Sequence, residues 1–402
     1  MNNKNRLFYG SCFALITTAF SFSIRAGILP QLGEAFDLNG QQLGFINSMW
    51  FLGFPISMIL GGLFYHTIGP KRIMQFAFLT HMLGIILTIY SGGYVGLLIS
   101  TLLIGIGNGC TEAACNPMIA DAYEGKEMNT LLNRFHMWFP GGIVLGSLIS
   151  KFMTDADLGW QAQIWVIVIP TLIYVYLFYG QEFPKSKVEA ANSVTGNLKA
   201  MATPIYIFIL GCMALTAISE FGPQQWTSLI MQSSGAQPML ILALVTGLMA
   251  VGRYFGGDIV HKFDQTGVLL GSAVLAAIGI FLFSTQTGPM VYVAAIFFAL
   301  GVCYFWPNMI GFVAEKIPAS GALGMSIVGG MGMFSTSIFQ PIIGGWIDNS
   351  TVEQAANGLT GTALDLAAGQ QTLTYMISFP GVLIVLFTIL YFWQRNLKPV
   401  AG

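Results

Sequence analysis

A carboxylate, Glu112, stands inside a long and mostly apolar stretch of the chain over 96–122, and Asn116 and Pro117 follow it. An acid within hydrocarbon is costly unless it has a partner, water or a proton, so it is a functional candidate. Glu112 and Asn116 are four residues apart and share one face of a helix. Pro117 removes a backbone donor and leaves a carbonyl of the preceding turn without its partner. This pattern predicts a hydrated polar site inside a membrane helix, at which Glu112 and Asn116 bind substrate and Glu112 carries a proton.

The cation that could face this acid is Arg25, which lies outward of the midpoint of the first apolar stretch. Its guanidinium either reaches the external interface or faces a cavity, where it would hold Glu112, sugar hydroxyls or a substrate carboxylate. We expect Arg25 to bind substrate and to be the charge partner of Glu112. The alternative for Glu112 is an ion pair with Arg25 or Arg134 that only fixes helix packing.

The stretch after Glu112 offers three further candidates, Arg134, His136 and Trp138. The indole face of Trp138 can stack on a sugar ring while its N–H serves a hydroxyl. His136 is either a proton relay or a packing histidine. Arg134 lies near the cytoplasmic end of its stretch and is expected to act as a gate or an anchor. His81 is expected to be structural.

Polar side chains gather again in the second half of the chain, where Glu220 ends an expected span over 203–221. Glu220 is either an interfacial charge or part of the site. Amides both donate and accept hydrogen bonds, and aromatic rings stack on apolar ligand faces, so the amide and aromatic side chains of this half suit a polyhydroxylated ligand. The substrate-binding candidates of this half are Gln224, Gln225, Trp226, Tyr304, Asn308 and Gln340.

Charged residues at the end of the eighth span are expected to form a gate. Together with Lys262, Arg253 and Asp258 can pair with neighbouring loop groups such as Asp121 or Glu315. Solvated ion pairs of this kind cost little to break, as a reversible conformational change requires.

The elements that must position these residues are membrane helices. The chain has 402 residues, 55% of them hydrophobic and only 8% charged, against about 25% charged in an ordinary soluble domain. A helix needs about 20 apolar residues to cross the bilayer. About twelve apolar runs meet this need, near 8–30, 42–65, 73–91, 95–121, 131–152, 163–181, 203–221, 237–257, 267–286, 289–313, 319–346 and 371–394.

The loop charges orient these spans. Lys and Arg are retained on the cytoplasmic side, and nearly all of them fall on the side that carries both termini, which predicts a multi-pass protein with both termini in the cytoplasm. A net charge of −1 does not favour nucleic-acid binding. The five cysteines lie within expected spans and suggest neither a disulfide framework nor a metal site.

A polar segment divides the chain into two sets of six helices. The predicted units are an N-terminal bundle over 1–182, a cytoplasmic linker over 183–202 and a C-terminal bundle over 203–402. Corresponding spans of the two halves carry proline interruptions, Asn116–Pro117 in the fourth and Trp306–Pro307 in the tenth. Such a pattern is expected of parallel repeats related by an axis along the membrane normal.

Two loop and helix motifs support a family resemblance. Gly61-Gly-Leu-Phe-Tyr-His-Thr-Ile-Gly-Pro-Lys-Arg72 resembles the signature loop between helices two and three of the major facilitator superfamily, with Tyr65 and His66 where that loop usually has Asp-Arg. The Glu-x3-Asn-Pro motif at Glu112 and the Trp-Pro motif resemble the fucose:proton symporter branch. Helix one departs from that branch, because Arg25 stands there in place of an acid. The resemblance implies an all-α fold of twelve transmembrane helices in two pseudo-symmetric six-helix bundles.

We therefore expect a secondary transporter, a monomer that moves a monosaccharide or related polyol with a proton by alternating access; sodium remains an alternative coupling ion, and no cofactor is expected. No Gly-x4-Gly-Lys-Ser/Thr phosphate loop is present, and an enzyme is not expected. One alternative is a carrier of small organic anions such as sugar acids, in which Arg25 neutralises a carboxylate. The other is a non-transporting membrane sensor on the same scaffold.

Overall fold

The described residues of the first half of the chain form seven α-helices. A computed structural model describes residues 3–123, 125–184, 194–254 and 256–396. Long apolar runs favour helices because a helix satisfies every internal backbone group within one segment. The helices before the linker are α1 (Asn3–Phe36), α2 (Gly40–Ile68), α3 (Pro70–Ile89), α4 (Tyr94–Ala122), α5 (Gly125–Asp155), α6 (Trp160–Val166) and α7 (Val168–Phe178).

The described residues of the second half are mostly helical as well. The short helix α8 (Val194–Met201) lies in the predicted linker. The helices that follow are α9 (Pro204–Ile230), α10 (Pro238–Tyr254), α11 (Gly256–Thr285), α12 (Met290–Val302), α13 (Phe305–Lys316), α14 (Gly321–Ala356), α15 (Gly361–Met376) and α16 (Ser378–Asn396), with a 3-10 turn, η1 (Pro318–Ser320), between α13 and α14.

These helices account for the predicted spans. Within the described residues, ten helical segments are long and apolar enough to cross a membrane, three of them made of two consecutive helices each (α6–α7, α12–α13 and α15–α16). Two further helices complete a set of twelve spans: α5, which is long enough but more polar than these ten, and α10, which has 17 residues. The predicted all-α membrane fold is therefore confirmed. One boundary is corrected: α9 runs to Ile230 and does not end near 221, so Glu220 lies inside the helix.

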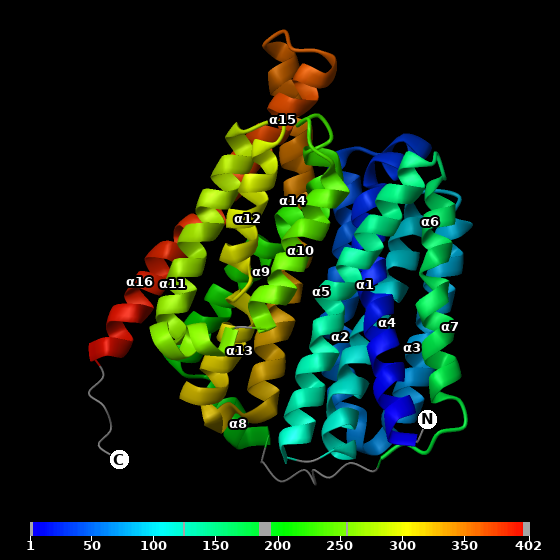
Figure 1. Ribbon diagram of the computed structural model, residues 1–402, viewed down its shortest axis with the longest axis vertical. Helices are drawn as coiled ribbons and strands as arrows, with labels where there is room; N and C mark the ends of the chain where they lie inside the picture. The colour runs from blue at the N-terminus through cyan, green and yellow to red at the C-terminus, as the bar shows by residue number, and fades with distance from the viewer. Residues whose placement is uncertain (1–2, 124, 185–193, 255, 397–402) are drawn as a thin grey trace.

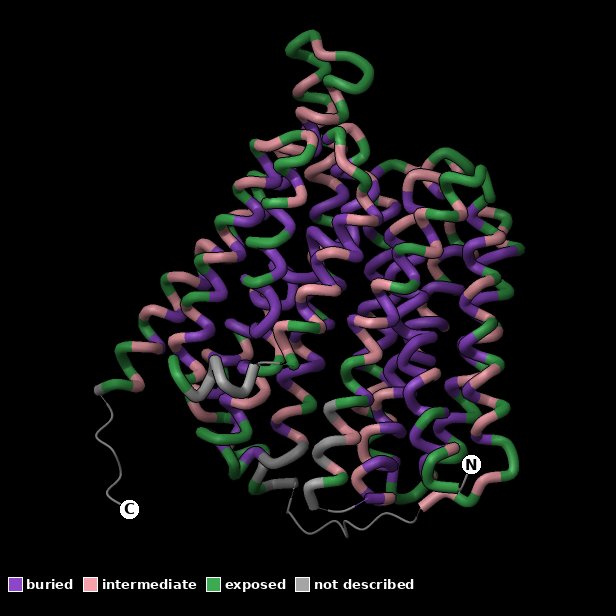
Figure 2. The backbone as a smooth tube through the Cα atoms, viewed as in Figure 1, coloured by how far each residue is buried: buried purple, intermediate pink, exposed green. Residues whose placement is uncertain are grey.

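The helices before and after the linker lie on opposite sides of the molecule (Figure 1). We call the end that carries the start of α1 and the short helix α8 the linker end, and the opposite end the far end. The last turns of α14 and the first turns of α15 project beyond the other helices at the far end (Figure 1). Buried residues follow the inward faces of the helices in both halves (Figure 2).

Glycines bring the two halves into direct backbone contact along α2 and α14. A side-chain carbon added at Gly44 would lie 2.5 Å from the carbonyl oxygen of Gln340 and from the Cα atom of Pro341. Toward the far end, one added at Gly40 would lie 2.6 Å from the carbonyl oxygen of Gly344. Glycines on these helices therefore allow their backbones to approach closely, as small residues do in other membrane proteins.

An aspartate from the second half caps a helix of the first half. The carboxylate of Asp348 on α14 accepts hydrogen bonds from the backbone N–H groups of Gly40 (2.7 Å) and Gln41 (2.9 Å) at the start of α2. Asn39 accepts from the N–H of Gln42, and the Gln42 side chain accepts from that of Asn39. The first N–H groups of a helix lack internal partners, and here both halves supply them.

We expect the substitution Asp348→Ala to loosen the start of α2. Loss of a capping side chain costs about 0.5–2 kcal/mol, which corresponds to local opening that is about 2–30 times more frequent. Hydrogen–deuterium exchange of peptides covering 37–45 measures this directly. The substitution Asp365→Ala, at an exposed acid on α15, serves as the control. Unchanged exchange in Asp348→Ala would show that the cap does not hold the two halves together.

Candidate substrate site

Arg25 is a buried cation at the interface between the halves. It lies within α1 and is only 5% exposed, so it does not reach the external interface. Its Nη2 donates a hydrogen bond of 2.6 Å to the Oε1 atom of Gln225 on α9. The guanidinium carbon lies 5.0 Å from the ring centroid of Trp50 and 5.8 Å from that of Phe51. An arginine favours such aromatic faces through cation–π attraction.

No carboxylate among the described residues balances this charge. The Nε and Nη1 atoms of Arg25 are buried and make no hydrogen bond within the described part of the chain. A buried cation without a counter-charge is unfavourable, and unused donors add to that cost. The arrangement is therefore suited to receive an anion or a strong hydrogen-bond acceptor.

Polar groups behind Trp50 fix the ring beneath Arg25. The indole N–H of Trp50 donates to the hydroxyl of Ser21 (2.9 Å), and the Asn108 amide donates to the same oxygen (3.2 Å). His81 contacts Asn108 through Nε2 (2.9 Å) and Tyr174 through Nδ1 (3.2 Å). Both ring nitrogens of His81 are thus satisfied inside the first half, which agrees with its expected structural role. The network holds the aromatic floor of the site in one orientation.

A small cavity adjoins Arg25. Its volume is about 20 Å³, and a water molecule needs roughly 10–15 Å³. The cavity therefore holds little more than one water, and all of its lining residues belong to the first half, so a substrate could enter only if the surrounding helices move. Its walls are mostly apolar: Ser21, Arg25, Ile28, Leu32, Ile46, Trp50, Thr88, Leu97, Thr101, Ile104, Ile164 and Ile167.

The second half contributes Gln225 to the site, and its side chain makes two hydrogen bonds to α1. Its Oε1 accepts from Arg25, and its Nε2 donates to the carbonyl oxygen of Phe22 (3.3 Å). One turn further, the hydroxyl of Ser228 donates to the carbonyl oxygen of Ala26. Together with the Asp348 cap, these hydrogen bonds join the halves from the level of Arg25 to the far end. The closed end of the molecule in this structure is thus the far end.

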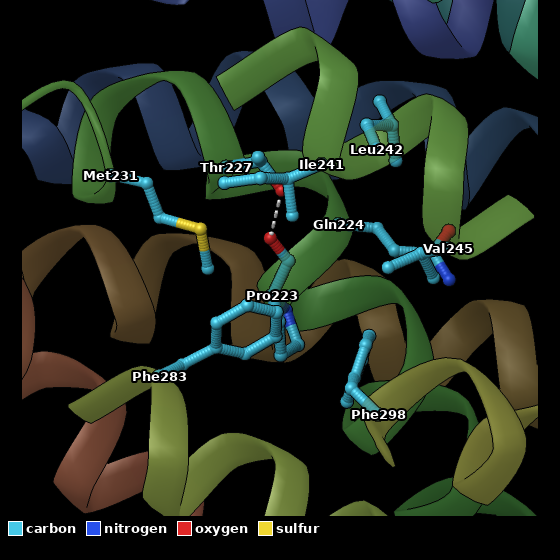
Figure 3. A pocket seen from close by; sticks show the side chains of 9 residues that line it. All are labelled: Pro223, Gln224, Thr227, Met231, Ile241, Leu242, Val245, Phe283 and Phe298. Atoms are coloured by element: carbon cyan, nitrogen blue, oxygen red, sulfur yellow. Dashed lines mark hydrogen bonds between the residues drawn. The ribbon is translucent and has the colours of Figure 1, made fainter. Parts of the chain in front are cut away.

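The neighbouring Gln224 points to a different place. It lines a cavity of about 10 Å³ within the second half, beside Pro223 and Thr227 (Figure 3). Its amide lies 3.6 Å from the sulfur of Met249, and the hydroxyl of Thr227 donates to the Pro223 carbonyl (2.7 Å). The walls are otherwise apolar, so this cavity offers no second charged site.

Glu112 does not meet Arg25, which corrects the expected partnership. Its Oε2 accepts a hydrogen bond of 2.5 Å from Asn116, whose amide also contacts the Glu112 carbonyl (3.2 Å). Both residues can be placed relative to the far end of the molecule, where α4 begins and α1 ends. At 1.5 Å per residue, Glu112 lies about 27 Å from that end along α4, whereas Arg25 lies about 17 Å from it along α1. The two charges therefore differ in depth. Glu112 is half-buried and lies toward the linker end.

The other predicted residues divide into buried and exposed ones. Trp226, Asn308 and Gln340 are buried, and each has a side-chain polar atom that makes no hydrogen bond within the described residues. Trp138 is half-buried, and Arg134 and His136 are exposed. The structure therefore forms two separate pairs from these residues: Arg25 binds Gln225, and Glu112 binds Asn116. It does not join all ten predicted binding residues into one pocket.

The predicted gate residues have other partners. Arg253 forms an ion pair with Glu220 (Nη2 to Oε1, 3.5 Å) in place of the expected loop acids. Asp121 accepts from the Tyr65 hydroxyl (2.9 Å), and Glu315 pairs with Lys316 (2.6 Å). The side chain of Asp258 lies outside the described part of the chain.

Several site residues were not foreseen. Trp50 and Phe51 fall in an apolar run, where aromatic residues are equally typical of lipid-facing positions. Ser21 and Asn108 carried a weak signal, as small polar residues inside apolar spans. Asn47 carried the same signal. It is fully buried on α2, and both polar atoms of its amide make no hydrogen bond in the described structure.

The fold and the site define a multi-pass membrane protein in which two helical halves close over a buried cation. Residues 11–340 match the sequence profile of the Major Facilitator Superfamily. The chain belongs to this superfamily and is a transporter, not an enzyme.

Curated relatives are distant. The chain is 24% identical over 349 residues to the 3-(3-hydroxy-phenyl)propionate transporter of Escherichia coli (strain K12), covering 83% of this chain and 86% of that protein. It is 25% identical over 182 residues to the hexuronate transporter of Bacillus subtilis (strain 168), covering 44% and 41%. It is 23% identical over 316 residues to the cis,cis-muconate transport protein of Acinetobacter baylyi, covering 72% and 75%.

Solved structures support the fold alone. The D-xylose–proton symporter superposes with a TM-score of 0.74 at 15% identity, covering 93% of this chain and 97% of the symporter. At this identity the likeness carries no information about the substrate of this chain.

Proposed function

We propose that the protein carries a small organic carboxylate across the membrane by alternating access, with Arg25 as its anion anchor. The observation that carries the proposal is the guanidinium itself, which is buried, has unused donors and has no acidic partner among the described residues. A guanidinium is better suited than an ammonium to hold a planar carboxylate. Its aromatic floor of Trp50 and Phe51 also suits an apolar or aromatic ligand body.

The relatives favour an acid over a neutral sugar. Hydroxyphenylpropionate, hexuronate and muconate, the substrates in the relatives' names, all bear at least one carboxylate. The expected monosaccharide and the resemblance to fucose:proton symporters remain predictions. They differ from the present proposal in one testable respect, because a neutral sugar has no group that requires the charge of Arg25.

A matched pair of ligands separates these possibilities. Galacturonate and galactose differ chiefly in one carboxylate, and 3-(3-hydroxyphenyl)propionate and muconate extend the panel. A ligand that binds the folded protein raises its apparent Tm. We expect one or more of the acids to raise the Tm of the purified protein and galactose to leave it unchanged. A shift with galactose equal to that with galacturonate would favour the sugar carrier, and no uptake of any bound ligand into proteoliposomes would favour a sensor.

Coupling and orientation belong to the same proposal. Glu112 is the proposed proton-binding group of the first half, with His136 as a relay at the same end of the molecule. The loop charges favour a cytoplasmic linker end in a bacterial inner membrane. In that orientation, the closed far end faces outward.

A further inference from the structure

The second half buries a carboxylate at the middle of the molecule. Glu220 is 3% exposed, and it lies about 24 Å along α9 from Pro204 and about 15 Å from Ile230. Its described partner is Arg253 of α10, at 3.5 Å. This distance is long for a charge-assisted hydrogen bond, which is typically near 2.8 Å. An acid held so loosely within a membrane protein is a candidate for reversible protonation.

Arg253 is fixed independently of this acid. Its Nε donates to the carbonyl oxygen of Cys303 (3.0 Å), at the break between α12 and α13. Beside it, the Tyr304 hydroxyl donates to the carbonyl oxygen of Gly252 (2.8 Å), and the Cys303 thiol lies 3.4 Å from the Met249 carbonyl. The arginine therefore keeps its position when Glu220 becomes neutral. Protonation would break the ion pair without displacing the cation.

The remaining charged groups around α9 are engaged elsewhere. Among the ion pairs of the described side chains, the cation that pairs with Glu220 is Arg253. Arg25, which α1 brings against α9, binds Gln225. Asp348 of α14 binds the start of α2 at the far end.

The same helix links this acid to the substrate anchor. Gln225, which holds Arg25, lies five residues or about 7.5 Å along α9 from Glu220. Pro223 stands between them and removes the backbone donor that would reach the carbonyl of Ser219. A proline within a membrane helix permits a local bend. A change at Glu220 can therefore alter the position of Gln225 relative to α1.

We infer that Glu220 is a proton-binding site of the second half, coupled through α9 to the anion held at Arg25. The coupling part of this inference rests on the proposed function. In the balanced step, the Glu220 carboxylate takes one proton from a hydronium ion, which leaves water, and becomes a neutral carboxylic acid, which frees the charge of Arg253. The substrate carboxylate brings one negative charge to Arg25. The loaded and empty proteins then carry the same net charge across the membrane.

Infrared difference titration of the purified protein tests the proton site without any substrate. Wild type should show the carbonyl band of a protonated carboxylic acid that disappears as pH rises, and Glu220→Gln should lack this component. Glu315→Gln, at an exposed acid paired with Lys316, should retain it. If Glu220→Gln does not fold, Arg253→Gln gives a second measurement: without the counter-charge, the band should persist to higher pH. A titrating band unchanged in Glu220→Gln, or unmoved in Arg253→Gln, would overturn the assignment.

Transport tests the coupling. With the carboxylate identified by the ligand panel, Glu220→Gln should lose at least tenfold of the accumulation driven by a proton gradient, and exchange of substrate across the membrane should fall far less. Equal loss of both, or loss of neither, contradicts coupling through Glu220. If no carboxylate binds, the proposed function fails, whereas the infrared titration still decides the proton site.

Discussion

The substitution Arg25→Gln should abolish binding of organic carboxylates to the purified protein. Removal of one partner from a buried, hydrogen-bonded charge pair costs about 2–5 kcal/mol, and affinity changes tenfold for every 1.4 kcal/mol. We therefore expect a loss of at least about 30-fold, measured by calorimetry with the strongest ligand of the panel. Arg25→Lys should also bind poorly, because one ammonium group cannot reproduce the planar set of donors that serves both Gln225 and a ligand.

The folding of this variant gives an independent readout. Arg25 carries a buried charge without an acidic partner among the described residues, and replacement of such a charge by a neutral group is often harmless or stabilising. The Tm of Arg25→Gln without ligand should thus equal or exceed that of wild type. Arg395→Gln is the control, because Arg395 also lies over an aromatic ring, that of Tyr391 at 4.5 Å, but at the end of α16. Carboxylate affinity within threefold of wild type in Arg25→Gln would place the anion site elsewhere.

Hydropathy predicted most of the fold. Apolar runs about 20 residues long leave few alternatives to a membrane helix. The end of the seventh span was misplaced because Gly222-Pro223 is a helix breaker in water, whereas α9 continues through it to Ile230. Within a membrane bundle, neighbouring helices and side-chain hydroxyls satisfy the groups that a proline frees.

The site was less predictable, because residue type and helical face do not say at which level of the membrane a side chain on one helix meets the neighbouring helix. Arg25 was recognisable as a charge within an apolar run and Gln225 as an amide just beyond the end of one, and the structure joins them. The expected contact of Arg25 with Glu112 fails because the two residues lie at different levels of antiparallel helices. The Asp348 cap was also unforeseen, since it depends on which helix of the other half faces α14.

The substitution Gly344→Ala should prevent the far end from closing. A side-chain carbon at Gly344 would overlap the carbonyl oxygen of Gly40 and lie 2.5 Å from its carbonyl carbon, both on the opposite half. These are backbone atoms of α2, so no side-chain rotation relieves the overlap. Overpacking of this kind costs about 1–3 kcal/mol, which would shift the balance of closed and open far ends about 5- to 150-fold toward open.

Spin labels at Ala156→Cys and Thr287→Cys, on exposed loops of the two halves at the far end, report this balance as a distance distribution. The five native cysteines are buried. Gly345→Ala is the matched control, since its added carbon meets only the flexible Gln41 amide at 3.9 Å. We expect longer distances in Gly344→Ala and the wild-type distribution in Gly345→Ala. Because an open far end exposes Arg25 to the other side of the membrane, Gly344→Ala should bind carboxylate from that side. A wild-type distance distribution in Gly344→Ala would mean that the halves do not separate along α2 and α14, and alternating access would need another line of opening.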